Sequence, residues 1–349
     1  MMTKMPSDFA AQSAILRLTS DLSGAEPLPA HLRGSVVAIG NFDGVHRGHQ
    51  AVLKKTLELA KMRQCPAVVL TFEPHPRSFF NPEQPVDRLT DAQEKAAILG
   101  LLGFDVVVEQ AFDASFSGLS AQEFIDQILI ERLGASEVIT GVDFHFGTKR
   151  QGNPAFLQQA GERHGFGVTL IEPFTDEGGA IVSSSRIRED LAEGDVVAAA
   201  ALLGYHYTLA SVVIKGRQLG RTLGFPTANM ALPLQTGLKH GIYAVRFRRA
   251  DGTLYDGVAS FGRRPTVDSD GSALLETFVF DFSGDLYGEF CSVSFFAYLR
   301  GEEKFDSLDA LMVQMHRDEA EARAILSGVQ SLSQLDSYLT FPDVAADAD

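Results

Sequence analysis

The sequence has few cysteines, no long apolar run and a shortage of basic residues. Its two cysteines, Cys65 and Cys291, form no CxxC motif and do not lie beside histidines at zinc-ligand spacing, which argues against a zinc site and fits a reducing compartment. The longest apolar run, VVAAAALL from Val196, is far shorter than the ~20 residues that span a bilayer. The N-terminal stretch lacks the continuous apolar core of a signal peptide. We therefore expect a soluble, cytoplasmic protein with no membrane partner.

The charge balance argues against a nucleic-acid partner. The chain has 45 acidic and 30 basic residues, which gives a formal net charge of −15. A surface that binds the phosphates of DNA or RNA needs a basic face that outweighs such a field. We therefore expect no nucleic-acid partner, and the sequence does not specify an oligomeric state.

Length and periodicity predict two domains, residues 1–203 and 204–349. The chain has 349 residues, 45% of them hydrophobic, which is enough to bury two cores. In the first part, apolar strands alternate with helices, which predicts a mostly parallel sheet covered on both faces. After a helix that ends at Gly204, β-rich segments follow with no helix until Ser307, which predicts an antiparallel barrel or sandwich.

A C-terminal helix and an acidic tail complete the second predicted domain. The helix starts near Ser307, and the tail DVAADAD is expected to be disordered. One face of the helix is expected to pack in the core through Leu308, Leu311, Met312 and Met315.

The stretch IGNFDGVHRGH, residues 39–49, follows a predicted strand and precedes a predicted helix. Ligands of parallel sheets bind beyond the carboxyl ends of the strands, and glycines let the backbone turn tightly and approach a ligand. His46 and His49 flank the helix start, where free N–H groups favour an anion, and at i and i+3 both rings can address one phosphate. Two alternatives stay open: a capped helix with two solvated histidines, and a metal site without a visible third ligand.

This stretch resembles the GxFDGxHxGH signature of the nucleotidyltransferase superfamily, which includes adenylyltransferases and class I aminoacyl-tRNA synthetases. TFEPHPRSFF from Thr71, GVDFHFGTKRQGN from Gly141 and VSSSRIRE from Val182 follow in the order found in the FMN adenylyltransferase module of bacterial bifunctional riboflavin kinase/FAD synthetases. The resemblance implies a Rossmann-like nucleotidyltransferase domain in which His46 and His49 are catalytic. The residues implied to bind nucleotide or phosphate are Gly40, Phe42, Asp43, Gly44, Gly48 and Asp143.

The serine-rich stretch begins a second predicted helix. Ser183, Ser184 and Ser185 are good capping residues, and Arg188 adds a fixed cation suited to a polyphosphate. An ordinary N-cap with a solvated arginine is the alternative. Beside the histidine motif, phosphate binding is the favoured interpretation.

Several side chains near these motifs are candidates for flavin contacts. Phe144 and Phe146 can stack on a flat ring, although they could equally belong to the core. His75 lies between two prolines, which predicts an extended loop, and an exposed loop histidine is the alternative. The resemblance favours flavin contacts for Phe72, His75, Phe144 and Phe146.

The stretch KGRQLGRTLGFPTANM, which starts at Lys215, is glycine-rich and locally basic, and is therefore suited to cover phosphates. Thr227 and Asn229 offer oxygen ligands two residues apart, as is reasonable for Mg²⁺ that also binds waters and substrate phosphates. A simple turn at PTAN is the alternative. The candidate phosphate-binding residues of the loop are Lys215, Gly216, Arg217, Gly220 and Arg221.

Glu276 lies in the predicted strand LLETFVFDF. Strand alternation places it on the same face as Phe278 and Phe280. A carboxylate among aromatic side chains is costly unless it has a partner or a purpose, and a base aimed at a substrate hydroxyl is such a purpose. A glutamate on a solvated rim, or one paired with a neighbouring cation, is the alternative.

These motifs, with GIYAV, GVASFGRRPTV and LRGEEKFDSLDAL, resemble in order the riboflavin kinase module of the same bifunctional enzymes. The resemblance implies an antiparallel barrel, Mg²⁺ near Thr227 and Asn229, and Glu276 as the catalytic base; Ser260 stands where many members have Asn. The implied enzyme converts riboflavin and ATP to FMN, and FMN and a second ATP to FAD and pyrophosphate. An aminoacyl-tRNA synthetase fragment and a flavin-binding or sensor protein without turnover are the alternatives.

Overall fold

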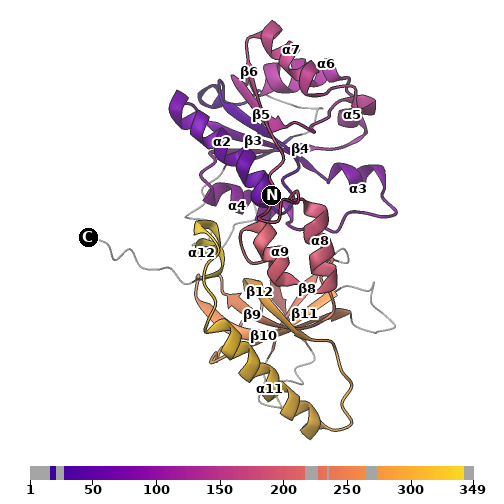
Figure 1. Cartoon of the computed structure of the whole chain (residues 1–349), viewed down its shortest axis with the longest axis vertical. Coiled ribbons are helices and arrows are strands. Elements are labelled where there is room, and N and C mark those ends of the chain that lie inside the picture. The colour runs from indigo at the N-terminus through magenta and orange to yellow at the C-terminus, as the bar shows by residue number, and fades with distance from the viewer. Residues whose placement is uncertain (1–15, 21–26, 217–226, 234–235, 264–272, 342–349) are drawn as a thin grey trace, which may run out of the picture. The chain divides into compact units, whose positions relative to one another are not determined.

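The computed structural model describes residues 16–20, 27–216, 227–233, 236–263 and 273–341. By its internal contacts the chain divides into two compact units (Figure 1). The N-terminal unit holds the described residues of 16–86 and 90–183, and the C-terminal unit holds 87–89 and the described residues from 184 onward. Arg217, Gly220, Arg221 and the acidic tail lie outside the described residues.

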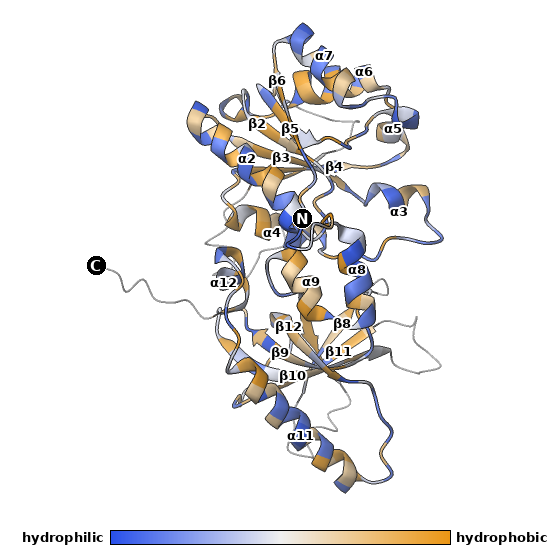
Figure 2. Cartoon of the chain, in the orientation of Figure 1, coloured by the Kyte–Doolittle hydropathy of each residue, from blue (hydrophilic) through white to orange (hydrophobic). Residues whose placement is uncertain are grey.

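The N-terminal unit contains a six-stranded sheet in the order β1-β4-β3-β2-β5-β6, and every neighbouring pair is parallel. The inner strands are rich in valine, isoleucine and leucine (Figure 2). They are buried along almost their whole length, as expected for a sheet covered on both faces. The predicted parallel sheet is therefore confirmed. The strands are β1 Leu16–Ser20, β2 Val36–Ile39, β3 Ala67–Glu73, β4 Val106–Ala111, β5 Glu137–Gly141 and β6 Gly167–Ile171.

Helices of the N-terminal unit follow most of the strands. The helix α2, Arg47–Arg63, packs on β2, β3 and β5. Residues 121–132 form a first turn, α6, which begins at a capping box on Ser120, and a π-helical continuation, η2. The remaining helices are η1 Ala30–Leu32, α3 Pro76–Phe80, α4 Ala92–Leu101, α5 Ala114–Ser117, α6 Ala121–Glu123, η2 Phe124–Arg132, η3 Thr148–Arg150 and α7 Pro154–His164.

The strand order reverses between β2 and β5. The chain runs from β2 outward through β3 to β4, and then returns to place β5 on the other side of β2. In sheets of this kind, ligands bind in the crevice outside the carboxyl ends of the strands at the point of reversal. The segments that follow β2 and β5 are therefore where a ligand is expected.

The C-terminal unit is a closed barrel of antiparallel strands in the order β10-β11-β8-β7-β12-β9. This confirms the barrel rather than a sandwich. Large side chains that are at most 1% exposed, among them Tyr243, Phe247, Phe261 and Phe295, form its core. The strands are β7 Thr208–Ile214, β8 Thr227–Leu232, β9 Gly241–Arg248, β10 Leu254–Arg263, β11 Ala273–Val279 and β12 Phe290–Arg300.

Two helices precede the barrel and one long helix lies against it. The helices α8, Ser184–Glu193, and α9, Val196–Leu203, come first, and α9 ends as predicted at Gly204, whose φ of 79° is left-handed. The helix α11, Leu308–Leu326, packs on β9, β10 and β12. It begins at the cap Ser307, as the sequence indicated.

The prediction that the start of α11 packs in the core was wrong for Leu308 and not confirmed for the other three residues. Leu308 is 63% exposed, while Leu311, Met312 and Met315 are only half-buried. The contacts with the barrel core come from the C-terminal half of the helix, where Ala322 and Leu326 pack with Phe280 and Phe296. Small and medium side chains near the end of the helix thus form the packed face.

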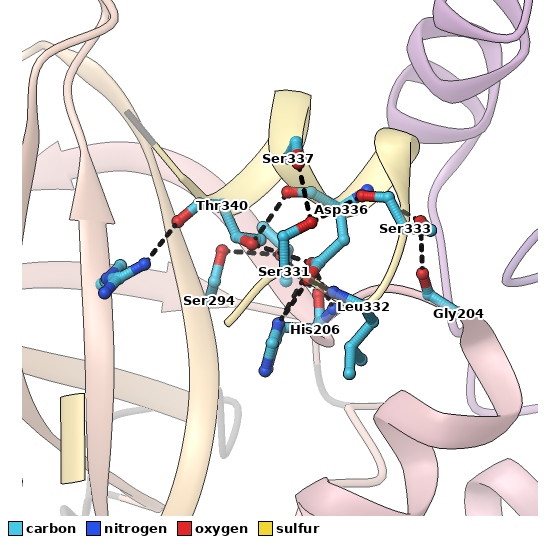
Figure 3. A network of polar contacts seen from close by, with 11 residues as sticks. Gly204, His206, Ser294, Ser331, Leu332, Ser333, Asp336, Ser337 and Thr340 are labelled. Atoms are coloured by element: carbon cyan, nitrogen blue, oxygen red, sulfur yellow. Dashed lines mark hydrogen bonds and ion pairs between the residues drawn. The ribbon is translucent and has the colours of Figure 1, made fainter. Parts of the chain in front are cut away.

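A last helix, α12 Gln334–Thr340, is attached to the start of the barrel by a buried polar network (Figure 3). Asp336, fully buried, accepts hydrogen bonds from the backbone N–H of His206 at 2.9 Å and from its ring Nδ1 at 3.0 Å. Ser333 donates to the carbonyl of Gly204 at 2.7 Å. The sequence did not predict this helix, which fixes the segment that leads into β7.

Candidate active sites

The turn between β2 and α2 is strained. Phe42 and Val45 have φ values of 49° and 37°, and both side chains are buried. Non-glycine residues in this region cost of order 1–3 kcal/mol each and persist only where their surroundings impose the conformation. Thr90 imposes it from the segment before α4, because its N–H donates to Asp43 at 3.2 Å and its hydroxyl accepts from Gly44 at 3.0 Å.

Gly48 lets α2 begin close to the ring of His46. A β carbon at this position would lie 3.1 Å from Cε1 of His46 and 3.4 Å from the carbonyl oxygen of Val182. Any larger residue would therefore press on the imidazole. Gly40 has a similar role on the other side of the turn, where a β carbon would lie 3.0 Å from the ring of Phe42.

His46 and His49 form a stacked pair at the N-terminus of α2. Their ring centroids are 3.6 Å apart and the planes differ by 16°. His46 is the N-cap, and its Nδ1 accepts the backbone N–H of His49 at 3.3 Å, so that the neutral ring carries its proton on Nε2. A capped helix is thus present, but His46 is only 5% exposed and His49 is half-buried, so the alternative of two solvated histidines was wrong for His46. Within the described ranges, no group of three or more His, Cys, Asp or Glu residues is placed to hold a metal ion.

Asp143 lies at the same edge of the sheet, two residues after β5. The hydroxyl of Thr140 donates to the carbonyl of Ile39 at 3.2 Å, which joins the ends of β5 and β2. Asp143 and the histidine pair therefore follow the two strands that flank the reversal of strand order. This placement suits a ligand that both segments contact.

The candidate flavin-binding phenylalanines differ in exposure. Phe72 and Phe146 are 8% and 7% exposed and belong to the hydrophobic core of the N-terminal unit. Phe144 is half-buried and stacks on Phe146, with centroids 5.4 Å apart. Of the three rings, Phe144 thus has the largest accessible surface for a flavin.

His75 is not an exposed loop histidine, so that alternative was wrong. Its backbone is extended, as its place between two prolines indicated, but α3 begins at the next residue. His75 is 9% exposed and caps this helix by accepting the N–H of Arg77 on Nδ1 at 3.1 Å. The cap ties the ring to the first turn of α3, which follows the carboxyl end of β3.

The serine stretch begins α8. Ser183 and Ser184 are half-buried, and Ser185 is exposed. Arg188 is half-buried and its Nε donates to the carbonyl of Asp87 at 2.6 Å within the C-terminal unit. Arg188 is therefore anchored rather than simply solvated, and its contact with phosphate stays a prediction.

On the barrel, the strand register places three polar residues at paired positions on adjacent strands. Glu276 on β11 pairs with Asn229 on β8 and with Ser260 on β10. Directly paired residues project from the same face of a sheet. In β11, Leu275, Thr277 and Val279 are buried, while Glu276 and Phe278 are half-buried, in agreement with the predicted alternation. Leu274 and Phe280, predicted on the face of Glu276, are also buried, so only the middle of the strand shows the alternation in burial.

The amide oxygen of Asn229 is suited to a cation. Its Nδ2 donates to the carbonyl and the hydroxyl of Thr227, at 3.2 and 3.3 Å. Among the residues that the structure describes, Oδ1 of Asn229 is buried and has no hydrogen-bond partner. Unsatisfied buried oxygens are rare, and an oxygen ligand of Mg²⁺ is one physical reason for such an atom. Thr227 and Asn229 lie in β8, so the alternative of a simple turn was wrong for both.

Gly216 brings the start of the glycine-rich loop against this oxygen. A β carbon on Gly216 would lie 2.5 Å from Oδ1 of Asn229. Lys215 is exposed, and its Nζ lies 5.8 Å from the centre of the Tyr287 ring. The described part of the loop thus starts beside Asn229.

Family models match both units. The FAD synthetase model matches residues 28–186, and the riboflavin kinase model matches residues 203–326. The chain is 44% identical over 297 residues to a bifunctional riboflavin kinase/FMN adenylyltransferase of Pseudomonas fluorescens, covering 85% of this chain and 94% of that protein. It is 40% identical over 290 residues to the Escherichia coli K12 protein of the same name, with coverage of 83% and 92%.

A solved structure also shares the fold. The crystal structure titled as a macrolide-efflux protein from Streptococcus pneumoniae is 32% identical, with a TM-score of 0.77, and the match covers 88% of this chain and 99% of that one.

In the described part of our chain, no helix has the length and apolar character needed to cross a membrane.

The family models on the parallel-sheet unit and on the barrel define a chain of two nucleotide-dependent transferase domains. The chain belongs to the family of bifunctional riboflavin kinase/FMN adenylyltransferases.

Proposed function

We propose that the chain converts riboflavin to FAD in two reactions, one in each unit. The barrel phosphorylates riboflavin with ATP to give FMN and ADP, and the N-terminal unit adenylylates FMN with a second ATP to give FAD and pyrophosphate. Both family models and the named relatives support this function. None of these findings favours a flavin-binding or sensor protein without turnover.

In the kinase reaction, Glu276 is the base that takes the proton of the ribityl 5′-hydroxyl. Its position beside Asn229 supports this role, because the base and the ligands of a phosphate-bound cation must address one substrate. Thr227 and Asn229 hold Mg²⁺, which when bound neutralises charge on the ATP phosphates. The start of the loop, Lys215 and Gly216, lies beside the phosphates.

In the adenylyl transfer, the phosphate of FMN attacks the α-phosphorus of ATP. His46 donates from Nε2, and His49 stabilises the same charge on the phosphoryl oxygens. Asp143 and the turn residues Gly40, Phe42, Asp43, Gly44 and Gly48 contact the nucleotide, and Phe144 contacts the flavin with support from Phe72, His75 and Phe146. Ser183, Ser184, Ser185 and Arg188 are assigned to the departing pyrophosphate by their likeness to the family motif.

Two groups of polar residues in one chain support this proposal: the stacked histidines at the point of strand reversal, and the paired Asn229 and Glu276 on the barrel.

We also propose a cytoplasmic location. Cys65 and Cys291 are unpaired, and burial raises the pKa of the Cys291 thiol to about 12, so that it stays a protonated thiol.

A chromatographic time course tests the function. The purified protein is incubated with riboflavin, ATP and Mg²⁺, and riboflavin, FMN and FAD are followed. We expect FMN to appear first and FAD to follow. FMN that accumulates without FAD would contradict the assignment of the N-terminal unit, and binding of riboflavin without either product would support the flavin-binding alternative.

A further inference from the structure

The N-terminal unit contains a buried lysine that the reaction described above does not use. Lys95 lies on α4, and its side chain is 1% exposed. Its ammonium donates to Glu73 at 2.8 Å, to the hydroxyl of Thr71 at 2.9 Å and to the carbonyl of Asn41 at 3.2 Å. Burial of an ammonium is costly unless it is paired and hydrogen-bonded, and these three oxygens supply that compensation.

The three acceptors lie at one place in the fold. Thr71 and Glu73 are in the last part of β3, and Asn41 is in the turn that follows β2. The hydroxyl of Thr71 itself donates to the Asn41 carbonyl at 3.1 Å, so the lysine, the threonine and the turn form a connected chain of hydrogen bonds. Lys95 thus ties α4 to the carboxyl ends of two parallel strands.

This attachment acts on the strained turn. Asn41 is next to Phe42, the first of the turn's two non-glycine residues with positive φ. The side chain and N–H of Thr90 hold Asp43 and Gly44, so contacts from Thr90 and Lys95 hold the turn on both sides of Phe42. His46 follows Val45, the last residue of this turn. A conformation that costs energy needs such supports, and the place of the imidazole depends on them.

If packing were the only requirement at position 95, an apolar residue would satisfy it. Replacement of a buried ion pair by well-packed hydrophobic residues is often neutral or stabilising. An ammonium, with three N–H donors, can bind three oxygens at once, here two from β3 and one from the turn after β2. The charged group therefore serves to hold these oxygens in place and not to stabilise the core by burial. At 1% exposure the ammonium is enclosed by protein and cannot contact substrate.

We propose that Lys95 is a positioning residue for adenylyl transfer, acting through the Asn41 carbonyl to hold the turn that places His46 and His49. This role rests on the assignment of the histidines under the proposed function. Lys95 makes no contact with the reacting atoms in this mechanism. Its effect is mainly on the transition state, because a small displacement of the rings weakens donation to the phosphoryl oxygens. Thr90 still holds Asp43 and Gly44, the turn residues assigned to the nucleotide, when the Lys95 contact is removed.

The test is Lys95→Met in the full-length protein, with adenylylation of supplied FMN measured below the melting temperature. We expect kcat to fall by about 100-fold, as a displacement near 1 Å can cause, with KM for ATP and FMN changed far less. Kinase activity of the same sample should stay unchanged, which measures the amount of intact protein. The matched control is Arg63→Met, which removes an ion pair of 2.8 Å to the buried Glu137 at the amino end of β5.

The outcomes separate positioning from general stability. If Arg63→Met lowers the melting temperature as much as Lys95→Met and also lowers adenylylation as much, Lys95 is only structural and the proposal fails. An unchanged kcat in Lys95→Met, or a loss confined to KM, also overturns it. If Lys95→Met does not fold, Thr71→Val decides: removal of the hydroxyl between Lys95 and Asn41 should lower kcat by about tenfold, and a wild-type kcat is contrary to the proposal.

His46→Asn in the same assay distinguishes a failure of the histidine assignment from a failure of the positioning role of Lys95. If this variant retains adenylylation, the assignment of the histidines fails, whatever Lys95 does. If it loses adenylylation while Lys95→Met and Thr71→Val retain it, the histidine site stands and only the positioning role of Lys95 is wrong.

Discussion

The imidazole rings of His46 and His49 stack face to face, with centroids 3.6 Å apart. The same pair is joined along the helix, because Nδ1 of His46 caps the N–H of His49. Each ring therefore limits the orientation of the other. Helix capping and the proposed phosphoryl contact use different nitrogens of His46, so the two can be separated by substitution.

His46→Asn should abolish most adenylylation while it preserves the helix cap. Asparagine is a good N-cap residue, so α2 should keep its start. Loss of one preorganised donor to a transition-state charge costs about 100- to 1,000-fold in kcat. FAD formation from supplied FMN and ATP measures the loss, and the kinase reaction should continue. His164→Asn, on α7, is the control, and a wild-type rate of FAD formation in His46→Asn is the result that would contradict the role of the imidazole.

Glu276→Gln should remove kinase activity and leave adenylylation of supplied FMN intact. The amide keeps the size of the side chain but cannot take a proton, and a general base contributes about 100- to 10,000-fold. FMN formation from riboflavin and ATP is the measurement. Glu303→Gln, an exposed glutamate of the same unit, controls for loss of charge. Equal kinase rates in the two variants would exclude Glu276 as the base.

Asn229→Ala should raise the Mg²⁺ concentration that gives half-maximal kinase activity. The substitution removes the buried Oδ1 of Asn229, and with it one proposed ligand. Gly216→Ala should act in the same direction, since its β carbon would displace that oxygen. Titrations of both variants with Mg²⁺ test this, with adenylylation as the reference. An unaltered Mg²⁺ titration in both would remove Asn229 from the proposed metal site.

Local patterns in the sequence predicted the parallel sheet, the barrel and the histidine turn. Apolar β-branched runs define buried strands directly, and the histidines are three residues apart, so their proximity follows from the start of one helix. The pairing of Glu276 with Asn229 required the register between β11 and β8, which no local pattern contains.

Other features depended on tertiary packing and were missed. The apolar stripe at the start of α11 extends beyond the contacts that bury the helix, so periodicity alone did not show that only the C-terminal half packs on the barrel core. The helix α12 has little apolar periodicity and is held by Asp336 and by arginine side chains of β9 that bond its last carbonyls. Lys95 lies four residues before the buried Leu99, and a lysine on an apolar helix face was the available signal.

The buried Asp336 should make the stability of the barrel depend on pH. Burial by itself raises the pKa of this carboxyl, but hydrogen bonds and the charge of His206, together with the N–H of Leu332, bring its pKa below the ordinary value of 3.8. A depressed pKa means that the carboxylate stabilises the folded state above the ordinary pKa. This stabilisation is lost as the pH falls below 3.8 toward the folded-state pKa.

Asp336→Asn should therefore lower the free energy of unfolding by about 3–5 kcal/mol at neutral pH, and the difference from the wild type should shrink on acidification. Tyrosine fluorescence during denaturation measures this selectively, because the chain has no tryptophan and all 7 tyrosines lie in the C-terminal unit. Asp251→Asn, at a half-exposed carboxylate, is the control and should change little. A difference between Asp336→Asn and the wild type that stays constant across the acid range would show that the amide disturbs packing and that the charge of Asp336 does not hold α12 in place.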